Sequence, residues 1–151
     1  MRLLYLEDYE PGRTFRSADY RVTATEIMEF ARTWDPQPFH VDEEAGRQSM
    51  FGSIIACSAH IFAVFCKLSN TVDSKTATLG GLGFDELRMH RPMRPGDTVH
   101  LAGECQSVRR SRSKPDRGIV RSAIRLYNHH DELVFSCTST FLVQSRDGGS
   151  T

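Results

Sequence analysis

Residues 51–68 read Phe51-Gly52-Ser53-Ile54-Ile55-Ala56-Cys57-Ser58-Ala59-His60-Ile61-Phe62-Ala63-Val64-Phe65-Cys66-Lys67-Leu68, and they contain the most apolar run of the chain. Two stripes recur at helical spacing in this stretch: Ile54, Ile61, Phe65 and Leu68, and then Ile55, Ala59, Phe62 and Cys66. Because the two stripes leave little polar face, we predict the longest helix here, opening at Phe51-Gly52-Ser53 and surrounded by protein on most sides. The run from Ile54 to Cys66 is too short for a bilayer, which needs ~20 residues.

The residues after this helix alternate between apolar and polar with a period of two. Apolar positions mark three strands, at Val99 and Leu101, at Val120, Ile124 and Leu126, and at Phe135, Cys137, Phe141 and Val143. Turn sequences separate them at residues 95–97, 114–118 and 128–131, and an earlier glycine-rich strand runs from Leu79 to about Met89. One apolar helix followed by hairpin-linked strands predicts an α+β fold, with an antiparallel sheet wrapped around the helix.

The region before the long helix reads as helix and loop. Phe15 to Val22 is a plausible strand, and Thr23 or Thr25 can cap a helix that runs to about Thr33. Pro36 and Pro38 then stop the helix and stiffen the next loop. Asp42 is interpreted as the cap of a further short helix, with Glu43 and Glu44 facing the positive end of its dipole.

Length and composition place limits on the protein class. The 151 residues fit one domain, which we assign to residues 1–145, with a flexible tail at 146–151. Lys and Arg number 19 and so do Asp and Glu, which predicts no general attraction to nucleic acid or to a membrane surface. The charged N-terminus is no signal peptide, and four cysteines without a CxxC pair suit free thiols in a cytoplasmic protein.

Asp35 and His40 are the residues most suggestive of chemistry. They lie five residues apart across the loop Asp35-Pro36-Gln37-Pro38-Phe39-His40, whose prolines restrict the backbone between them. Two titratable groups that converge in this way can hold one water, with one group removing a proton and the other supplying one. The spacing alone is weak evidence, because an aspartate and a histidine five residues apart also occur by chance.

The nearly uncharged helix start downstream strengthens this interpretation. Backbone N–H groups at the N-terminus of a helix are preorganised donors for a developing oxyanion. A thioester carbonyl bound there would be polarised, so that its β-carbon becomes open to attack by water. Asp35, His40 and the helix start therefore supply the parts needed to hydrate an α,β-unsaturated thioester.

These residues resemble the hydratase motif of MaoC-like dehydratases, a family that includes the (R)-specific enoyl-CoA hydratases. The resemblance is carried by Phe30-Ala31, by residues 35–45 and by Phe51-Gly52-Ser53-Ile54-Ile55-Ala56. It continues through residues 81–88 and 91–98, and it covers the chain from about Tyr5 to Val143.

The resemblance implies a hotdog fold, in which an antiparallel sheet curls round a long central helix. It further implies a homodimer with a continuous sheet, or a trimer of such dimers, and an active site near the subunit interface. Asp35 and His40 would be the catalytic pair, and Ser58, Cys57, Gly80 and Gly81 would contact the acyl-CoA substrate. No metal or redox cofactor is expected, and coenzyme A would belong to the substrate.

The chain departs from the family pattern at two places. Gln37 replaces a usual asparagine, and Ala56-Cys57-Ser58 stands where the family reads Ala-His-Gly or Ala-Ser-Gly. The glycine of that pattern offers its backbone N–H to the thioester oxygen. Ser58 retains an N–H for this contact, but its side chain occupies space that a glycine leaves free.

Other chemically suggestive residues favour structural roles. His60, Cys57 and Cys66 are interpreted as core residues of the apolar helix, and His129-His130 as solvated side chains in a hairpin turn. The basic segment from Arg109 to Arg117 suits a solvated hairpin, with contact to the coenzyme A phosphates as the alternative. Arg91, Arg94 or Arg112 could recognise an acidic acyl chain, and the sequence does not select among them.

Three functions remain open at this point. The first is a hydro-lyase that interconverts an enoyl-CoA and a 3-hydroxyacyl-CoA through Asp35 and His40. The second is a hotdog acyl-CoA thioesterase, in which a carboxylate activates water against the carbonyl carbon. The third is a non-catalytic acyl-CoA-binding subunit, in which the change at Cys57-Ser58 has ended catalysis.

Overall fold

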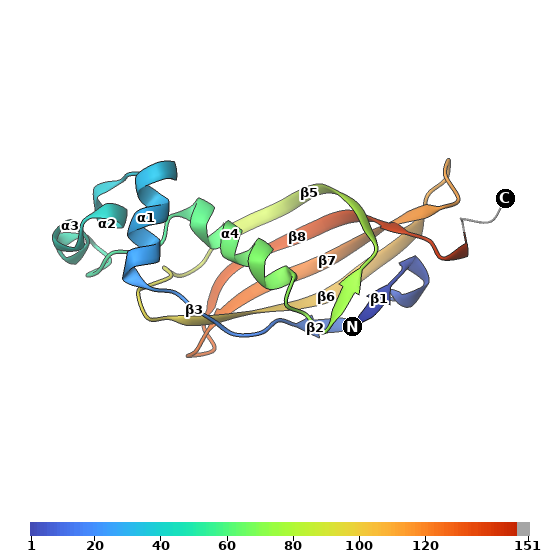
Figure 1. Cartoon of the computed structure of the whole chain (residues 1–151), viewed down its shortest axis with the longest axis horizontal. Helices are drawn as coiled ribbons and strands as arrows, with labels where there is room; N and C mark the ends of the chain where they lie inside the picture. The colour runs from blue at the N-terminus through green and yellow to red at the C-terminus, as the bar shows by residue number, and fades with distance from the viewer. Residues whose placement is uncertain (148–151) are drawn as a thin grey trace.

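The computed structural model describes residues 1–147 and shows a sheet with one long helix across it (Figure 1). The strands are β1 (Arg2–Leu4), β2 (Thr14–Arg16), β3 (Tyr20–Arg21), β4 (Ser74–Thr76), β5 (Thr78–Met89), β6 (Thr98–Arg110), β7 (Arg117–Asn128) and β8 (Leu133–Gln144). The α-helices are α1 (Ala24–Trp34), α2 (Pro38–Val41), α3 (Glu43–Gln48) and α4 (Ser58–Ser69), and one 3-10 turn, η1, covers Leu6–Asp8. None of the helices within 1–147 is long and apolar enough to cross a membrane.

The main sheet is antiparallel, with the strand order β2-β6-β7-β8-β5, and β3 also pairs with β6. The four long strands follow one another along the chain from β5 onward, and their bounds confirm the strands predicted from the period-two pattern. A separate parallel pair joins β1 to β4. The α+β architecture expected from the sequence is therefore present.

The core lies between α4 and the inner face of the sheet. From α4 it takes Ile61, Val64, Phe65 and Leu68, and from the sheet Leu101, Leu126 and Phe135. Full burial of one such side chain contributes roughly 1.5–3 kcal/mol to stability, so these contacts dominate the attachment of α4 to the sheet. Figure 1 shows α1, α2 and α3 gathered beyond the N-terminal end of α4, while β1 and β4 lie at its other end.

The start of α4 differs from the sequence-based expectation. The helix begins at Ser58 instead of Phe51, and Ile54 to Cys57 are extended. The cause is backbone pairing, because the N–H of Ile55 donates to the carbonyl of Phe39 and the N–H of Ala56 donates to the carbonyl of Met93. These residues are buried like the rest of the apolar run, so composition alone did not separate them from the helix.

The expectation that protein surrounds α4 on most sides is also wrong for the single chain. Ser58, Ala59 and Cys66 are exposed, so Cys66 is not the core residue that the sequence indicated, whereas Cys57 is fully buried. The neighbouring edge strand β5 exposes five large apolar side chains, Leu79, Leu82, Phe84, Leu87 and Met89. One side of α4 and the edge of the sheet are therefore open in this chain.

Two smaller differences concern the ends of the domain. The single strand expected from Phe15 to Val22 is divided into β2 and β3. Between them, Ser17 pairs with Leu101 through its backbone N–H and through its hydroxyl, which accepts from the N–H of Leu101. Arg146, which we assigned to the tail, donates from its N–H to Glu7, and residues 148–151 of that tail lie outside the described residues.

Candidate active site

Asp35 and His40 are brought together by the end of α1 and the single turn of α2. The hydroxyl of Thr23 caps α1 by accepting from the N–H of Glu26, as the sequence predicted. The N–H of Asp35 makes the last backbone bond of the helix, to the carbonyl of Ala31, and the prolines that follow at 36 and 38 keep the helix from continuing. Pro38 then occupies the first position of α2, where a missing N–H costs nothing, and α2 presents His40.

His40 and Asp35 face each other without a direct hydrogen bond. The distance from Nε2 of His40 to Oδ2 of Asp35 is 3.7 Å, and His40 is buried while the side chain of Asp35 is 40% exposed. Nδ1 of His40 lies 2.6 Å from the carbonyl oxygen of Ile55. Because a carbonyl only accepts, Nδ1 carries the proton and donates, and Nε2 of the neutral ring keeps a lone pair on the side of Asp35.

The extended segment 54–57 links this pair to α4. Its backbone is held by Phe39 and Met93, and Gly46 of α3 packs directly on it. A Cβ at Gly46 would lie 2.4 Å from the backbone nitrogen of Ile54, so only glycine permits this approach. The segment is therefore fixed from three sides, and with it the carbonyl of Ile55 that orients His40.

The start of α4 offers free backbone donors next to Asp35. Ser58 is the first residue of the helix and is exposed, and its N–H donates to no protein acceptor within residues 1–147. The side chain of the preceding residue, Cys57, does not face solvent. Burial raises the pKa of the Cys57 thiol, and the negative charge of Asp35 adds to the increase.

His60 lies one turn into α4 and joins that helix to α1. Its Nε2 is 3.1 Å from Oε1 of Glu26, which also accepts from the hydroxyl of Tyr20, and its ring stacks on Phe30 at 4.6 Å. Nδ1 of His60 is buried without a partner among residues 1–147. His60 is thus a core histidine, as expected from the sequence, although only one of its nitrogens is satisfied.

Gly80 and Gly81, predicted to contact substrate, lie away from Asp35 and His40. They occupy the first half of β5, where the pairing with β8 shifts register at each of them, and Gly81 lines a pocket at the C-terminal end of α4. The structure therefore brings together Asp35, His40, Cys57 and Ser58 at one end of α4 and places Gly80 and Gly81 toward the other.

Most of the basic residues weighed in the sequence already have protein partners. Arg91 pairs with Glu132 at 3.0 Å, and Arg94 donates to the hydroxyl of Ser53 at 2.8 Å and to the carbonyl of Phe51. Arg110 pairs with Glu7, and Arg117 with Asp116. Arg94 in particular holds the turn before segment 54–57, which is a structural role.

Sequence reasoning missed the pocket of about 490 Å³ at the C-terminal end of α4. A signal for it existed, since serines replace apolar residues at the inward-facing positions 122 and 139 of β7 and β8. A single serine at an inward-facing strand position is common and predicts nothing by itself. The pair becomes informative only when the two strands are known to be neighbours.

Comparison with known proteins gives consistent matches. The family model described as "MaoC like domain" matches residues 8–124. A MaoC-like dehydratase from Rhodospirillum rubrum is 39% identical, with a TM-score of 0.86 over 95% of this chain and 98% of that one. The Bacillus subtilis protein YdeM is 26% identical over 92% of this chain and 98% of its own length.

A third similarity is structural. An R-hydratase from Pseudomonas aeruginosa, in its unliganded form, is 22% identical and superposes with a TM-score of 0.75 over 94% of this chain and 86% of that one. At this identity the match supports the fold alone. Together with the sheet and helix described above, these matches confirm the hotdog fold expected from the sequence.

Proposed function

This chain belongs to the MaoC-like domain family, and on that premise we propose that it is a hydro-lyase of acyl-CoA thioesters. It would add water to an enoyl-CoA, or remove water from a 3-hydroxyacyl-CoA. The observation that carries the proposal is the approach of His40 to within 3.7 Å of Asp35, together with the N–H of Ser58 at the start of α4, which has no protein acceptor within residues 1–147. The family match and the R-hydratase fold support a hydratase or dehydratase in general terms.

A water lying to one side of the two side chains can reach both of them, because atoms 3.7 Å apart share a position within hydrogen-bond distance of each. A water there can donate to Nε2 of His40 and to Oδ2 of Asp35, since each is an acceptor in the neutral-ring, ionised-carboxylate form. The carbonyl of Ile55 binds Nδ1 of His40, so the ring is held in an orientation that directs Nε2 at the water. This preorganisation lowers the entropy cost of reaching the transition state.

Hydration then follows in two linked steps. One member of the pair removes a proton from the water as its oxygen bonds to the β-carbon, and the alkene electrons move toward the thioester carbonyl. The N–H of Ser58 donates to the resulting oxyanion at the positive end of the α4 dipole. The pair returns a proton to the α-carbon, which completes the addition of one water without any redox change.

The assembly expected for this function is a homodimer formed through β5. Among the described residues, β5 is an edge strand of the main sheet, and no strand pairs with the backbone on its outer side. Five of its large apolar side chains are exposed. Long apolar edge strands associate readily, and pairing two copies would continue the sheet. We propose that this pairing also covers the open side of α4.

Substitution of the pair tests the proposal. Asp35→Asn and His40→Gln keep size and shape while removing the acid–base function, and each should lower the hydration rate of crotonyl-CoA by on the order of 10²-fold or more. Hydration is followed by the loss of enone absorbance. His129→Gln, an exposed histidine in the β7–β8 turn, is the matched control and should retain wild-type turnover. Unchanged turnover in either pair variant would overturn the assignment.

Two further outcomes separate the alternatives. Release of free thiol from saturated acyl-CoAs would identify a thioesterase. Tight binding of acyl-CoA without turnover of any enoyl-CoA or 3-hydroxyacyl-CoA would identify a non-catalytic binding subunit. The hydro-lyase predicts neither, because its substrate keeps the thioester bond throughout.

A further inference from the structure

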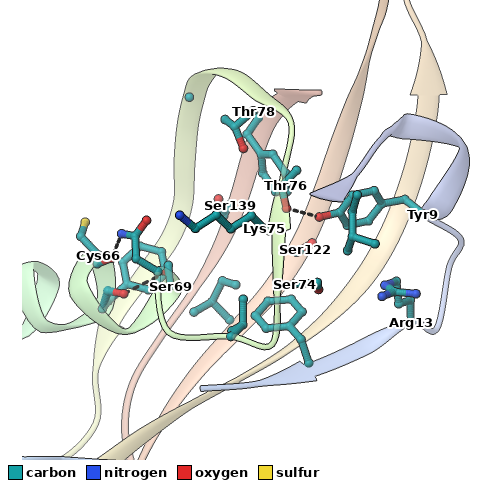
Figure 2. Close-up of a pocket in the computed structure, with 18 of the residues that line it drawn as sticks. Tyr9, Arg13, Cys66, Ser69, Ser74, Lys75, Thr76, Thr78, Ser122 and Ser139 are labelled. Carbon is teal, nitrogen blue, oxygen red and sulfur yellow. Dashed lines mark hydrogen bonds between the residues drawn. The ribbon is translucent and has the colours of Figure 1, made fainter. Parts of the chain in front are cut away.

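The pocket at the C-terminal end of α4 has an apolar floor of the kind that binds small ligands. Its volume is about 490 Å³, within the range of small-molecule sites. Phe65 of α4, Phe84 of β5, Ile124 of β7 and Phe141 of β8 contribute to the floor, and Leu4 and Phe15 contribute from the N-terminal strands. Figure 2 shows the pocket between the end of α4, the strand β4 with the start of β5, and the main sheet.

Two serines interrupt this apolar surface side by side. Ser122 of β7 lies directly opposite Ser139 of β8, between apolar neighbours at Val120, Ile124 and Phe141. Ser122 is only 1% exposed, and its hydroxyl has no hydrogen-bond partner among the described residues. An unsatisfied buried hydroxyl is unfavourable for the empty protein, and a ligand oxygen in the pocket would satisfy it.

The charged residues around the pocket are all cationic. Arg13 and Lys75 line it, and of the described lining residues none is an aspartate or glutamate. Neither side chain forms an ion pair with any residue from 1 to 147. In Figure 2 the amine of Lys75 points toward the end of α4, where the helix carbonyls carry partial negative charge, while Arg13 lies on the opposite side.

We propose that this pocket receives the far end of an acyl group that terminates in a second carboxylate, with Arg13 as its charge partner and Ser122 and Ser139 as hydrogen-bond donors. The inference rests on the proposed function, because it names the class of thioester that the hydro-lyase would accept. A carboxylate enters an apolar pocket only where a cation and hydrogen bonds replace its hydration, and this pocket offers both. An alkyl end would leave the hydroxyl of Ser122 unsatisfied.

The position of the pocket limits the length of the acyl group. Ser58 begins α4, and Cys66, three residues before the helix ends at Ser69, lines the pocket. The eight residue steps from Ser58 to Cys66 span roughly 12 Å. A four-carbon acyl group held at Ser58 is too short to reach this distance. The preferred substrate is therefore a dicarboxylic acyl-CoA of medium chain length, whereas a short enoyl-CoA such as crotonyl-CoA would occupy only the Ser58 end and leave this pocket empty.

Direct binding of saturated thioesters tests the inference without turnover. The matched ligands are octanoyl-CoA and suberoyl-CoA, which share eight acyl carbons and differ in the terminal carboxylate. Titration calorimetry on the wild-type protein should show suberoyl-CoA bound roughly tenfold more tightly, the effect of about one charge-assisted hydrogen bond. Equal or tighter binding of octanoyl-CoA would overturn the proposal.

Variants assign the preference to residues. Arg13→Gln should reduce the preference for suberoyl-CoA to about twofold or less, and Ser122→Ala should reduce it by several-fold in a protein that remains folded. Arg125→Gln removes an exposed arginine that does not line the pocket, and it should keep the wild-type preference. A preference that survives Arg13→Gln would contradict the assigned charge partner.

The failure of this inference is distinct from the failure of the proposed function. Saturated thioesters have no double bond to hydrate, so the binding comparison is informative whether or not the protein is a hydro-lyase. If the protein hydrates crotonyl-CoA but does not prefer suberoyl-CoA, only the pocket inference is contradicted. If the protein prefers suberoyl-CoA but hydrates no enoyl-CoA, only the proposed hydro-lyase function is contradicted.

Discussion

The two ends of α4 differ in whether the protein itself satisfies their polar groups. At the N-terminal end, Nδ1 of His40 is bound to Ile55 and the segment 54–57 is pinned by its neighbours. At the C-terminal end, the hydroxyl of Ser122 has no partner within 1–147, and Arg13 has no ion-pair partner in that range. The first arrangement is preorganised for reaction, while the second is completed only when a ligand arrives.

The difference follows from what each end must do. Acid–base chemistry requires groups held at fixed geometry before the substrate binds, so the supporting contacts must come from the protein. Recognition of a ligand's far end requires unpaired groups, because a group already paired has little to gain from the ligand. At the N-terminal end, substitutions should therefore lower both the stability and the turnover. At the C-terminal end, removal of an unpaired polar group should raise the stability while it weakens ligand binding.

The largest effect is expected from Gly46→Ala, beside the catalytic pair. The new Cβ would lie 2.4 Å from the nitrogen of Ile54, and the clash would displace the segment that orients His40. We expect a loss in crotonyl-CoA turnover of more than tenfold, together with destabilisation of about 1–3 kcal/mol, from overpacking. Turnover and urea unfolding measure the two effects.

A control separates packing from helix propensity. Gln48→Ala changes an exposed residue of the same short helix, α3, and should keep both turnover and stability close to wild type. Wild-type turnover in Gly46→Ala would show that segment 54–57 tolerates movement. In that case the N-terminal end of α4 would be less rigid than its contacts indicate.

A smaller effect, dependent on pH, is expected in the N-terminal segment. Burial opposes ionisation of Glu7, but the N–H of Arg146, the hydroxyl of Ser145 and the charge of Arg110 outweigh it and lower the pKa of Glu7 to about 2. Its ordinary value is 4.5. Because the folded-state pKa lies below the unfolded one, Glu7 stabilises the protein above about pH 4.5, and this contribution is lost as the pH falls toward 2.

The measurement is the urea midpoint as a function of pH. In the wild type it should stay level from pH 7 to 5 and then fall between pH 4.5 and 2, while Glu7→Gln starts lower and falls less. Glu10→Gln, a nearby exposed carboxylate, is the control and should follow the wild type. Identical pH profiles for Glu7→Gln and wild type would show that Glu7 does not anchor the N-terminal segment.

The smallest effect, and the one of opposite sign, is expected from Ser122→Ala in the pocket. Removing a buried hydroxyl without a partner among residues 1–147 removes an uncompensated polar group, so the free energy of unfolding should rise by about 1 kcal/mol. Thermal unfolding in the absence of ligand measures the change. Destabilisation by 1 kcal/mol or more would mean that Ser122 has a structural partner.

Much of the fold was predictable because it depends on local pattern. The period-two alternation placed β6 to β8, and the glycine-rich stretch placed β5. The hydroxyl of Thr23, one of the two predicted caps, caps the start of α1, and the carboxylate of Asp42 caps α3 as predicted. The helix start at Phe51 was wrong because Ile55 and Ala56 pair with the backbone of Phe39 and Met93, residues remote in sequence. Cys66 was wrongly placed in the core because its helical stripe faces the open side of α4.

By itself the sequence determined the family, the antiparallel sheet with its central helix, and the candidate pair Asp35 and His40. The sheet and helix follow from periodicity over short stretches, which does not need the tertiary structure to be recognised, and the family follows from the resemblance of the motifs around Asp35 and His40. Only the tertiary structure decided that α4 starts at Ser58, and that Ser122, Ser139 and Arg13 line one pocket. Those residues come from separate strands and from the segment before β2, so only the folded chain brings them together.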